Sequence, residues 1–573
     1  MAATAAEKSI RLYADSELAG LTAGKLSAIY IGLREAYREL LLVHAETERR
    51  LANSVEKLNL AQAARFGRKS ERSVATAESK EQRNEDGEAT DSVEESDEHS
   101  SGDSDHAEKK AFRSTARKRP VRSKGCAKKV WEDLPVRDVH VELTKDELIE
   151  KFGEGEWRDF SEKVYETIRY IPASCYIERT HIHVYRSAGK FAVAGSAPAK
   201  LWPKSLASPS LIAGILNDKF VLGMPAYRIW QEFLRNGLKL TSQCMNSWIT
   251  RCGIELFEPV VMRMKKLMFE TRHIQADETP VTVGHAADGK RSECRFWVFR
   301  TSDLTRGPTI TVFHFALTRS TDELREFLED YRGTITCDGY VSYRTYEREH
   351  PKDITVTGCL THCRRYFTDV LKAMRSYHSL EDKEKQKIPA HQAVEKLGKI
   401  FSEEKKLKTL ESAERLEQRK ERIAPLVDDF FTWVKSFGSE DFESGGLTEK
   451  AMNYSLNQEP YLRRFLEDGL VPLHNSSCEQ SIIPFCVGRN NWKCIDSIDG
   501  ATAAGYHYTI AETARRNGAN IYLYYRFLLE RLPGILATHS GSGETFECLD
   551  SLMPWNDEYR RYETECLAEI RKT

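Results

Sequence analysis

Acidic side chains beside predicted strands are the residues of this 573-residue chain best suited to shared chemistry. Asp277 follows the segment HIQA and Asp338 follows TITC, and both segments read as strands that end at the aspartate. Carboxylates delivered by neighbouring strand ends could hold a shared divalent cation, because hard cations prefer oxygen ligands. The segments ADET and CDGY also look like turns, so each aspartate has an ordinary structural explanation. If the strand continues, Glu278 should point to the opposite face from Asp277.

A second polar segment, LHNSSCEQSIIPFCVGRNNWKC, carries a glutamate, cations and an aromatic residue at high density. Glu479 comes just after HNSSC, which is a predicted helix start. The run from Arg489 to Lys493, which includes Asn491, forms a donor-rich patch suited to phosphates. The spacing alone leaves open whether Glu479 meets the two aspartates.

The elements that must position these residues predict an α/β fold. Three strand-like segments (HIQADETPVTV, CRFWVFRTSD and PTITVFHFALT), a helix (TDELREFLEDY) and a further strand (GTITCDGYVSY) are the opening of a ribonuclease-H-like sheet. The charged, helical stretch that follows predicts an insertion. We therefore expect a core in residues 266–368 and 466–530, a helical insertion at 369–465, and a C-terminal tail at 531–573.

Two helical regions precede this core. Residues 1–68 hold leucines at a seven-residue spacing (Leu26, Leu33 and Leu40), which predicts a self-associating coiled coil, although one long helix packed on its own protein is the alternative. In residues 201–265, two helices joined through NGLKLTS resemble a helix-turn-helix, and Thr241 or Ser242 could cap the second helix. Ordinary helix packing gives similar patterns. The side chains expected to reach DNA are Gln243, Asn246 and Arg251.

Residues 69–129 change abruptly in composition, first acidic and Ser-rich, then basic. Such a stretch has too little apolar surface to fold. Its basic end is either a phosphate-contacting arm, with Arg119, Arg122 and Lys124, or a solvated linker. Residues 130–200 alternate in the strand manner and predict a small β unit. His181 and His183 in this unit have no partner pair at zinc-ligand spacing, so no zinc is expected.

The composition narrows the class of protein. The net charge of −2 argues mildly against a nucleic-acid binder, but its distribution along the chain matters more. The chain has no run of 18 apolar residues, and its start lacks the apolar core of a secretory signal, so we expect a cytoplasmic protein that does not enter a membrane. The 13 cysteines include no CxxC pair, which predicts reduced and mostly buried thiols.

Several long motifs, in order, resemble the IS66 family of bacterial insertion-sequence transposases. They are ARFGRKSER, MPAYRIWQEFLRNGLKLTSQCMNSWITR, ADETPV, CDGY, CLTHCRRYF, NSSCEQSIIPFCVGRNNWKC and AETARRNGANIYLYYRFLLERLP. The late LMPWN resembles the family's C-terminal element. The resemblance covers most of the chain.

The resemblance implies a DDE transposase with a ribonuclease-H-like core. It assigns the catalytic and metal-binding triad to Asp277, Asp338 and Glu479, which would hold two Mg²⁺ (or Mn²⁺) ions, with Asp277 between them. Water would nick the ends of the element, and the freed 3′-hydroxyl would attack target DNA. The segment CLTHCRRYF would supply active-site or DNA-backbone contacts through His362, Arg364 and Arg365; for His362, a place in the core is the alternative.

The expected partners are double-stranded DNA (terminal inverted repeats and target), further copies of the chain, and small accessory proteins of the element. When bound to DNA the protein would lie at the bacterial nucleoid. Three features depart from the family pattern: the Cys-rich zinc segment is reduced to Cys175, the run before Glu479 is LHNSS, and Gln480 replaces an arginine. One alternative is therefore a catalytically decayed, coiled-coil DNA-binding protein that occupies the element's ends. A nuclease without transposition activity is another.

Overall fold

The computed structural model describes residues 22–66, 207–284, 291–438, 441–538 and 548–572, with residue 149, two short strands at 184–187 and 190–193, and residues 201, 202 and 205. Contacts divide the chain into two compact units, Met1–Ser73 with Ala173–Glu563, and Val74–Pro172 with Thr564–Thr573. The expected basic arm and the histidine pair of the β unit lie outside the described residues. Among the described helices, none is long and apolar enough to cross a membrane.

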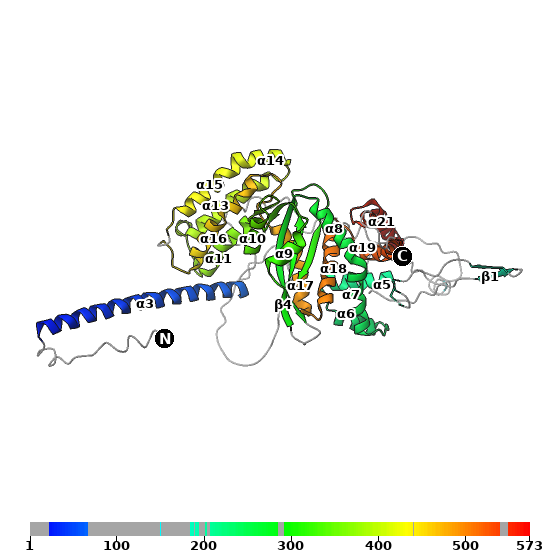
Figure 1. Cartoon of the computed structure of the whole chain (residues 1–573), viewed down its shortest axis with the longest axis horizontal. Helices are drawn as coiled ribbons and strands as arrows, with labels where there is room; N and C mark the ends of the chain where they lie inside the picture. Colours follow the sequence, from blue (N-terminus) through cyan, green and yellow to red (C-terminus); the bar gives the residue numbers. More distant parts are fainter. Residues whose placement is uncertain are drawn as a thin grey trace. The chain divides into compact units, whose positions relative to one another are not determined.

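A mixed six-stranded sheet forms the centre of the first unit (Figure 1). Its order is β5-β4-β3-β6-β7, and β8 also pairs with β3. The strands β3, β4 and β5 are antiparallel, whereas β6, β7 and β8 run parallel to their partners. The parallel additions need helical crossovers, which α9 (Thr321–Leu328) and α10 (Val341–Glu349) provide. The strands are β3 (His273–Gly284), β4 (Arg291–Thr301), β5 (Thr311–Ala316), β6 (Gly333–Thr336), β7 (Ile354–Thr357) and β8 (Cys494–Ile495).

The long central strand β3 is paired unequally on its two sides. On one side β4 pairs with it from Ile274 to Gly284. On the other side β6 stops opposite Gln275, and β8 begins only opposite Thr282. On this side, residues 276–281 therefore face a gap that no strand of the described part of the chain fills. The expectation that Asp277 ends a strand in an ADET turn is wrong, because the ladder with β4 carries β3 straight through this position.

The two faces of the sheet are covered by different helices. Aromatic contacts identify α10 and α9 on one face (Trp297–Tyr343 and Phe299–Phe327) and α17 (Ser476–Trp492) on the other (Phe296–Phe485). Asp277 pairs with Val298 and Glu278 with Trp297 across the β3–β4 ladder. Since paired residues share a face, Asp277 lies on the α17 side and Glu278 on the α9–α10 side, as the alternation of strand side chains predicts.

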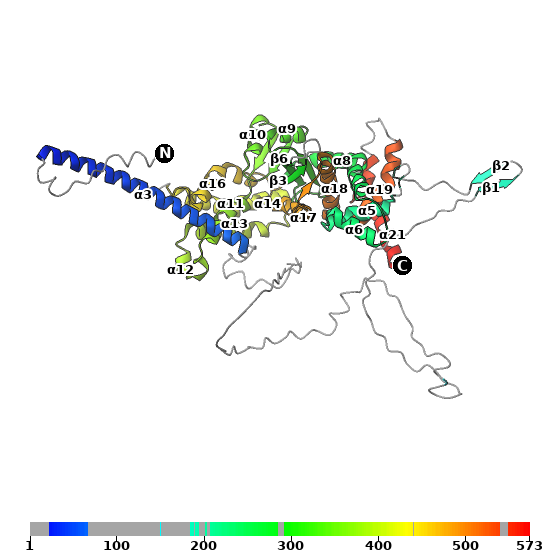
Figure 2. The same cartoon turned by 90° about the horizontal axis from the view of Figure 1, so that it is seen from below.

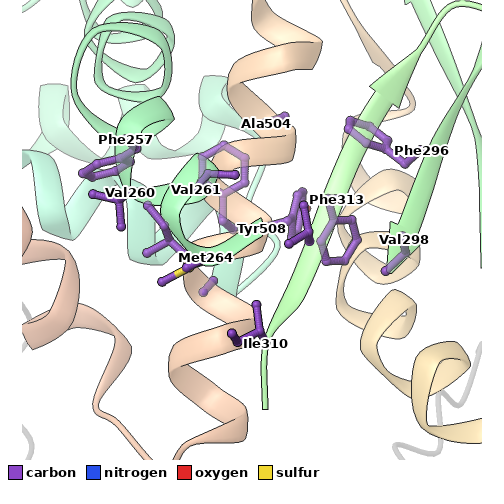
Figure 3. Close-up of a cluster of buried hydrophobic side chains, with 14 of the residues drawn as sticks. Phe257, Val260, Val261, Met264, Phe296, Val298, Ile310, Phe313, Ala504 and Tyr508 are labelled. Carbon is purple, nitrogen blue, oxygen red and sulfur yellow. The ribbon is translucent and has the colours of Figure 1, made fainter. Parts of the chain in front are cut away.

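Helix α18 (Ile498–Arg516) packs along the edge strand β5. Figure 3 shows its residues Ala504 and Tyr508 between Phe257 and Val261 on one side and Phe313 of β5 on the other. The Tyr508 and Phe313 rings have centroids 5.6 Å apart. The hydrophobic core therefore continues from the sheet into the helices α5 (Pro209–Leu216), η4 (Asn217–Val221), α8 (Glu258–Phe269) and α19 (Ile521–Thr538).

The two expected helices of the helix-turn-helix-like region are α6 (Ala226–Arg235) and α7 (Ser242–Arg251). Gly237 follows α6 with a φ of 84°, a left-handed conformation that glycine adopts at low cost. Thr241 caps α7, and its hydroxyl accepts a hydrogen bond from the Cys244 amide at 3.1 Å. Of the two caps expected for the second helix, Thr241 or Ser242, the structure has Thr241. The second helix is longer than expected, because the chain continues through η5 (Cys252–Phe257) into α8.

A group of helices separates β7 from α17. The helix α11 (Leu360–Ala373) packs against α13 and α16 (Figure 2). The helix α13 also packs against α15. The buried Arg419 ties the group together, because its guanidinium pairs with Glu404 and donates to the Phe465 carbonyl at 2.8 Å. The helices are η6 (Tyr377–Ser379), α12 (Asp382–Lys385), α13 (Pro389–Lys406), α14 (Ser412–Gln418), η7 (Arg419–Ile423), α15 (Ala424–Lys435), α16 (Leu447–Leu462) and η9 (Arg464–Leu466).

Helices also lie toward both ends of the described part of the chain. The helix α3 (Ala23–Phe66) contacts α11. In its C-terminal half, the Asn53 side chain donates a hydrogen bond to the Ser444 carbonyl at 2.9 Å. The segment expected as a C-terminal tail contains η10 (Leu549–Leu552) and α21 (Asp557–Lys572), where buried Tyr559 packs on Tyr524 of α19. Of the expected small β unit, the structure describes the antiparallel strands β1 (Val184–Ser187) and β2 (Lys190–Val193). The domain boundaries themselves stay predictions.

The cysteines agree with the prediction of reduced thiols. Each one in the described ranges is free, and most are buried.

Candidate active site

At the gap beside β3, backbone groups of the strand form hydrogen bonds with side chains instead of with a neighbouring strand. The Ala276 carbonyl accepts a hydrogen bond from Asn475 Nδ2 at 2.9 Å, and the Pro280 carbonyl accepts one from Arg489. Between them the Glu278 amide donates to Asp277 Oδ1 at 2.8 Å. Since the N–H and C=O of a strand residue point to the same side, the missing N–H of Pro280 faces this gap and leaves the β3–β4 ladder intact. The Asp277 carboxylate is therefore held at the gap.

Asp338 reaches the same place from the neighbouring strand. The strand β6 pairs Thr336 with Gln275, and Asp338 comes two residues later. The Cys337 amide donates to the Thr357 carbonyl at 3.0 Å, which keeps the chain in line with β7. Asp338 Oδ1 then accepts the Tyr340 amide at 2.9 Å, which fixes the turn that leads into α10.

Glu479 is brought to the gap by the start of α17. Gln275 of β3 donates through Nε2 to the His474 carbonyl at 2.9 Å, and the Asn475 amide donates to the Cys359 thiol at 3.2 Å. With Asn475 also bonded to β3, the first turn of α17 is fixed beside Asp277. The Glu479 carboxylate accepts a hydrogen bond from Arg365 Nη2 at 3.0 Å. His362 Nε2 lies 3.5 Å from its other oxygen.

The electrostatics identify these carboxylates as neighbours. Burial, followed by the negative charge of Glu278, raises the pKa of Asp277 to about 8, and Asp338 and Glu479 act in the same direction. The pKa of Glu278 is also raised, by burial and then by Asp338. Burial and then the charge of Arg365 lower the pKa of His362. The site thus concentrates more negative charge than its own cations neutralise.

The carboxylate groups of the site are suitable ligands for a divalent cation. Glu479 Oε1 is buried without a hydrogen-bond partner, and Asp277 lies among like charges, so a cation here would relieve both groups. Carboxylate oxygens are the ligands that Mg²⁺ prefers. Glu278 is already paired with Arg319, which leaves Asp277, Asp338 and Glu479 as the donors. In the described ranges, no three His, Cys, Asp or Glu side chains are yet arranged as a finished metal site.

The residues of α7 expected to contact DNA fall into two groups. Gln243 and Asn246 are exposed on the helix surface. Arg251 instead forms a bidentate pair with Glu255, with Nε–Oε1 at 2.7 Å and Nη2–Oε2 at 2.9 Å, and its guanidinium lies 4.6 Å from the Trp202 ring centroid. Of the three predicted contact residues, Arg251 is therefore the one already engaged in an ion pair within the described part of the chain.

The other predicted contacts also differ in their surroundings. Arg489 reaches back to β3 and donates to Thr279 Oγ1 at 2.9 Å, so it joins α17 to the sheet. Asn491 is exposed and donates to the Gly223 carbonyl at 3.0 Å, and Lys493 is exposed at the end of α17. Arg364 is half-buried on α11. The three arm residues, Arg119, Arg122 and Lys124, lie outside the described residues.

Three residues of the site were not expected from the sequence. They are Asn475, Arg319 and Tyr340. Asn475 connects α17 to β3, and Arg319 neutralises Glu278. The Arg319 guanidinium also lies 3.6 Å from the centroid of the Tyr340 ring. A signal for Asn475 was present, since LHNSS retains one asparagine of the family's acidic-Asn-Asn run. Nothing in the sequence marks Arg319 as a partner of a residue 41 positions away.

Comparisons with known proteins identify the family of the chain. The sequence model described as "Transposase IS66 family" matches residues 204–503, which is 300 of 573 residues and more than half of the chain. A second, described as "Transposase C of IS166 homeodomain", matches residues 55–139.

Relatives in Sinorhizobium fredii (strain NBRC 101917 / NGR234) include three proteins named as uncharacterized, each 25% identical to this chain. With y4jD the match covers 70% of this chain and 76% of the relative, and with y4hP it covers 78% of each. With y4qI it covers 63% of this chain and 64% of the relative, just under two thirds. The family match, which includes all three site carboxylates, decides the assignment: the chain belongs to the IS66 family of transposases.

Proposed function

We propose that the chain is a DNA transposase that binds the ends of its element and carries out metal-dependent strand cleavage and strand transfer. The observation that carries the proposal is the common neighbourhood of Asp277, Asp338 and Glu479 at the gap in the sheet. These residues are 61 and 141 positions apart in sequence, yet Asp338 and Glu479 both raise the pKa of Asp277. Carboxylates that converge from distant elements and raise the pKa of one of their number are typical of a functional site.

The sheet supports a ribonuclease-H-like core. Three strands, a helix and a further strand are the succession expected from the sequence, and β3, β4, β5, α9 and β6 follow it. The structure adds the directions: β3, β4 and β5 are antiparallel, and β6 is parallel to β3. The helices α12 to α16 come before the last carboxylate, where the insertion is expected.

In the proposed reaction Asp277, Asp338 and Glu479 would hold two Mg²⁺ (or Mn²⁺) ions. The ions would supply an activated oxygen nucleophile and stabilise the leaving oxygen during phosphodiester cleavage and transfer. Glu278 and Arg319 form a neutral pair behind Asp277 and keep its backbone in place. His362 and Arg365 lie beside Glu479. They would offer hydrogen-bonding and cationic groups to a phosphate there once Arg365 turns from the carboxylate.

DNA binding would use surfaces away from the carboxylates. The exposed amides of Gln243 and Asn246 can read base edges, as amide side chains do in the major groove. The basic arm would contact phosphates, and binding should therefore weaken with salt. Further copies of the chain and small accessory proteins are the other proposed partners.

One observation favours a second candidate, a decayed transposase that binds the ends without cutting them. Glu479 is already bound to Arg365, and the carboxylates are not arranged as a finished metal site in the described part of the chain. Cleavage would then require Arg365 to turn from Glu479 toward a DNA phosphate. The two candidates share every binding feature and differ only in cleavage.

The experiment is cleavage of labelled duplexes that carry the element's terminal repeat, with Mg²⁺ or Mn²⁺, by the wild type and by Asp277→Asn. We expect the wild type to cut and join the ends and the variant to lose both activities, because an amide is a poor ligand for the cation. Binding of the same DNA, measured by gel shift, should be unchanged. Chelation by EDTA should stop the wild type, and added Mg²⁺ should restore it.

The matched control is Asp382→Asn, which removes one carboxylate whose side chain is 99% exposed on α12. This control should cut at the wild-type rate. Strand transfer retained by Asp277→Asn would refute the catalytic assignment. Binding without cleavage by the wild type, under every metal condition, would favour the decayed transposase.

A further inference from the structure

A cavity of about 530 Å³ opens beside Asp338. One wall is the turn after β6, from Asp338 to Tyr340, and a second is α11 with His362 and Tyr366. The third wall belongs to α16 of the helical group, which contributes Tyr454 and Gln458. The cavity therefore joins the candidate catalytic carboxylates to the helices that separate β7 from α17.

The walls combine aromatic faces with an amide. The rings of Tyr366 and Tyr454 stack, with centroids 4.4 Å apart and planes 28° apart, and Tyr366 remains 42% exposed. Burial raises the pKa of Tyr454, so its phenol stays neutral. The Gln458 side chain is 95% buried at the cavity, and no hydrogen bond ties its amide to another group in the described ranges. An amide both donates and accepts, as the edge of a nucleobase does.

Gly339 allows these walls to meet. A Cβ at this position would lie 3.0 Å from Tyr454 Cε2 and 3.1 Å from Gln458 Nε2. Glycine thus brings the aromatic ring and the amide of α16 against the residue that follows Asp338. The close approach therefore places this ring and this amide next to Asp338, the proposed metal ligand.

We infer that this cavity receives one unstacked nucleobase of the DNA end, beside the phosphate that is cut. The inference rests on the proposed function, since it requires a phosphate at Asp338. A nucleobase is joined to its phosphate through a single sugar, so a phosphate at the carboxylates leaves its base within reach of the cavity. The volume falls in the range of about 300–1,000 Å³ that holds small organic ligands. Stacking on tyrosine is tolerant of base identity, and the Gln458 amide would add a preference.

Unpairing a base costs free energy, and stacking and hydrogen bonds inside the cavity would offset that cost. Tyr366 is the best residue to test, because it is exposed and its ring can be removed without opening the core. It acts as a positioning residue for the base. The substitution Tyr366→Ala should therefore slow cleavage of a paired end by about 10-fold, the scale of one lost base–aromatic stack. Tyr366→Phe keeps the ring and should stay close to the wild type.

The test uses the full chain and duplexes with the element's terminal repeat, with each position near the cut paired or mismatched in turn. One mismatch position should restore cleavage by Tyr366→Ala to nearly the wild-type rate, since the base there is already unpaired. Leu456→Ala is the control, because Leu456 is an exposed side chain of the neighbouring helix α16 that does not line the cavity.

The outcomes distinguish a failure of the proposed function from a failure of the base-binding inference. If the wild type cuts no end DNA, the proposed function fails. If the wild type cuts and Tyr366→Ala treats paired and mismatched ends alike, at a normal or a reduced rate, the inference is overturned and the proposed function stands. Rescue at one mismatch position, with no rescue at the others, supports the inference and also shows that the variant is folded.

Discussion

His507 is a buried histidine whose neutral form the fold requires. Its ring stacks on Phe220 at 4.5 Å, and Nε2 donates to the Ile249 carbonyl at 2.8 Å. Complete burial, with a smaller contribution from the charge of Lys219, lowers its pKa to about 3. The folded pKa lies below the unfolded value of about 6.5, so the stabilisation is full above pH 6.5 and is lost as the pH falls toward 3.

We therefore expect His507 to reduce the free energy of unfolding by about 2 kcal/mol between pH 7 and pH 5. His507→Gln keeps an N–H donor for Ile249 but does not titrate, so it should be less stable at pH 7 and lose less stability on acidification. Denaturant unfolding at both pH values, followed by tryptophan fluorescence, measures the difference. Equal losses in the two proteins would contradict the assignment.

At the residue scale, the sequence predicted the types and the order of the candidate site residues better than their setting. The opposite-face prediction for Glu278 was correct, because the alternation of strand side chains is local. Asp277 was wrongly placed at a strand end, because the ladder that extends β3 comes from β4 and is invisible in the segment itself. The hydrogen bond from Arg365 to Glu479 joins residues 114 positions apart, and nothing in the sequence indicates it.

At the scale of elements, the exposed edge of β5 is closed by side chains of α18. The Phe313 amide donates to Thr509 Oγ1 at 2.9 Å, and the Thr311 amide donates to Thr513 Oγ1 at 3.1 Å. Asn517 bonds both the amide and the carbonyl of Thr309. A helix rather than another strand thus satisfies this edge, which would otherwise offer a template for aggregation.

Thr509→Val keeps the shape of the side chain but removes the acceptor of the Phe313 amide. A buried amide left without a partner should destabilise the chain by about 1–3 kcal/mol. Thr509→Ser, which keeps the hydroxyl, should be closer to the wild type. The melting temperatures of the three proteins provide the comparison, and a valine variant at least as stable as the serine variant would count against this role of α18.

The elements themselves were predictable where their signals are local. Thr241 and Gly237 mark a helix start and a helix stop through cap chemistry, and the structure has both. The gap beside β3 was not predictable. It exists because the two-residue strand β8 pairs with β3 from about 210 positions away and leaves residues 276–281 open. The site thus depends on a tertiary pairing that no single segment encodes.

At the scale of the whole molecule, one side of the helix α3 contacts the rest of the chain, and the opposite side exposes leucine side chains. Asn53 and Glu56 bond the segment around residues 444–447. At 3.6 residues per turn, Leu51 and Leu58 lie on the opposite side of the helix from these contacts, and both are exposed. The seven-residue leucine seam of the N-terminal half continues this uncovered side.

The uncovered seam is where we expect copies of the chain to associate. Leu33 and Leu40 are 58% and 62% exposed, which costs free energy that a coiled-coil partner would recover. The double change Leu33→Lys with Leu40→Lys should raise the dissociation constant by at least about 100-fold, since each buried leucine contributes about 1.5–3 kcal/mol. Light scattering of the full chain over a range of concentrations would measure the shift toward monomer.

The matched control places the same two charges on the other side of the same helix, as Ile31→Lys with Leu42→Lys. Ile31 and Leu42 are 53% and 72% exposed, so the control alters charge and apolar surface to a similar degree. If the seam associates, only the Leu33 and Leu40 pair should produce monomers, because a helix pairs through one face at a time. Equal effects of both pairs would point to general apolar contact. A wild type that is monomeric at every concentration would instead mean that the seam awaits a different partner.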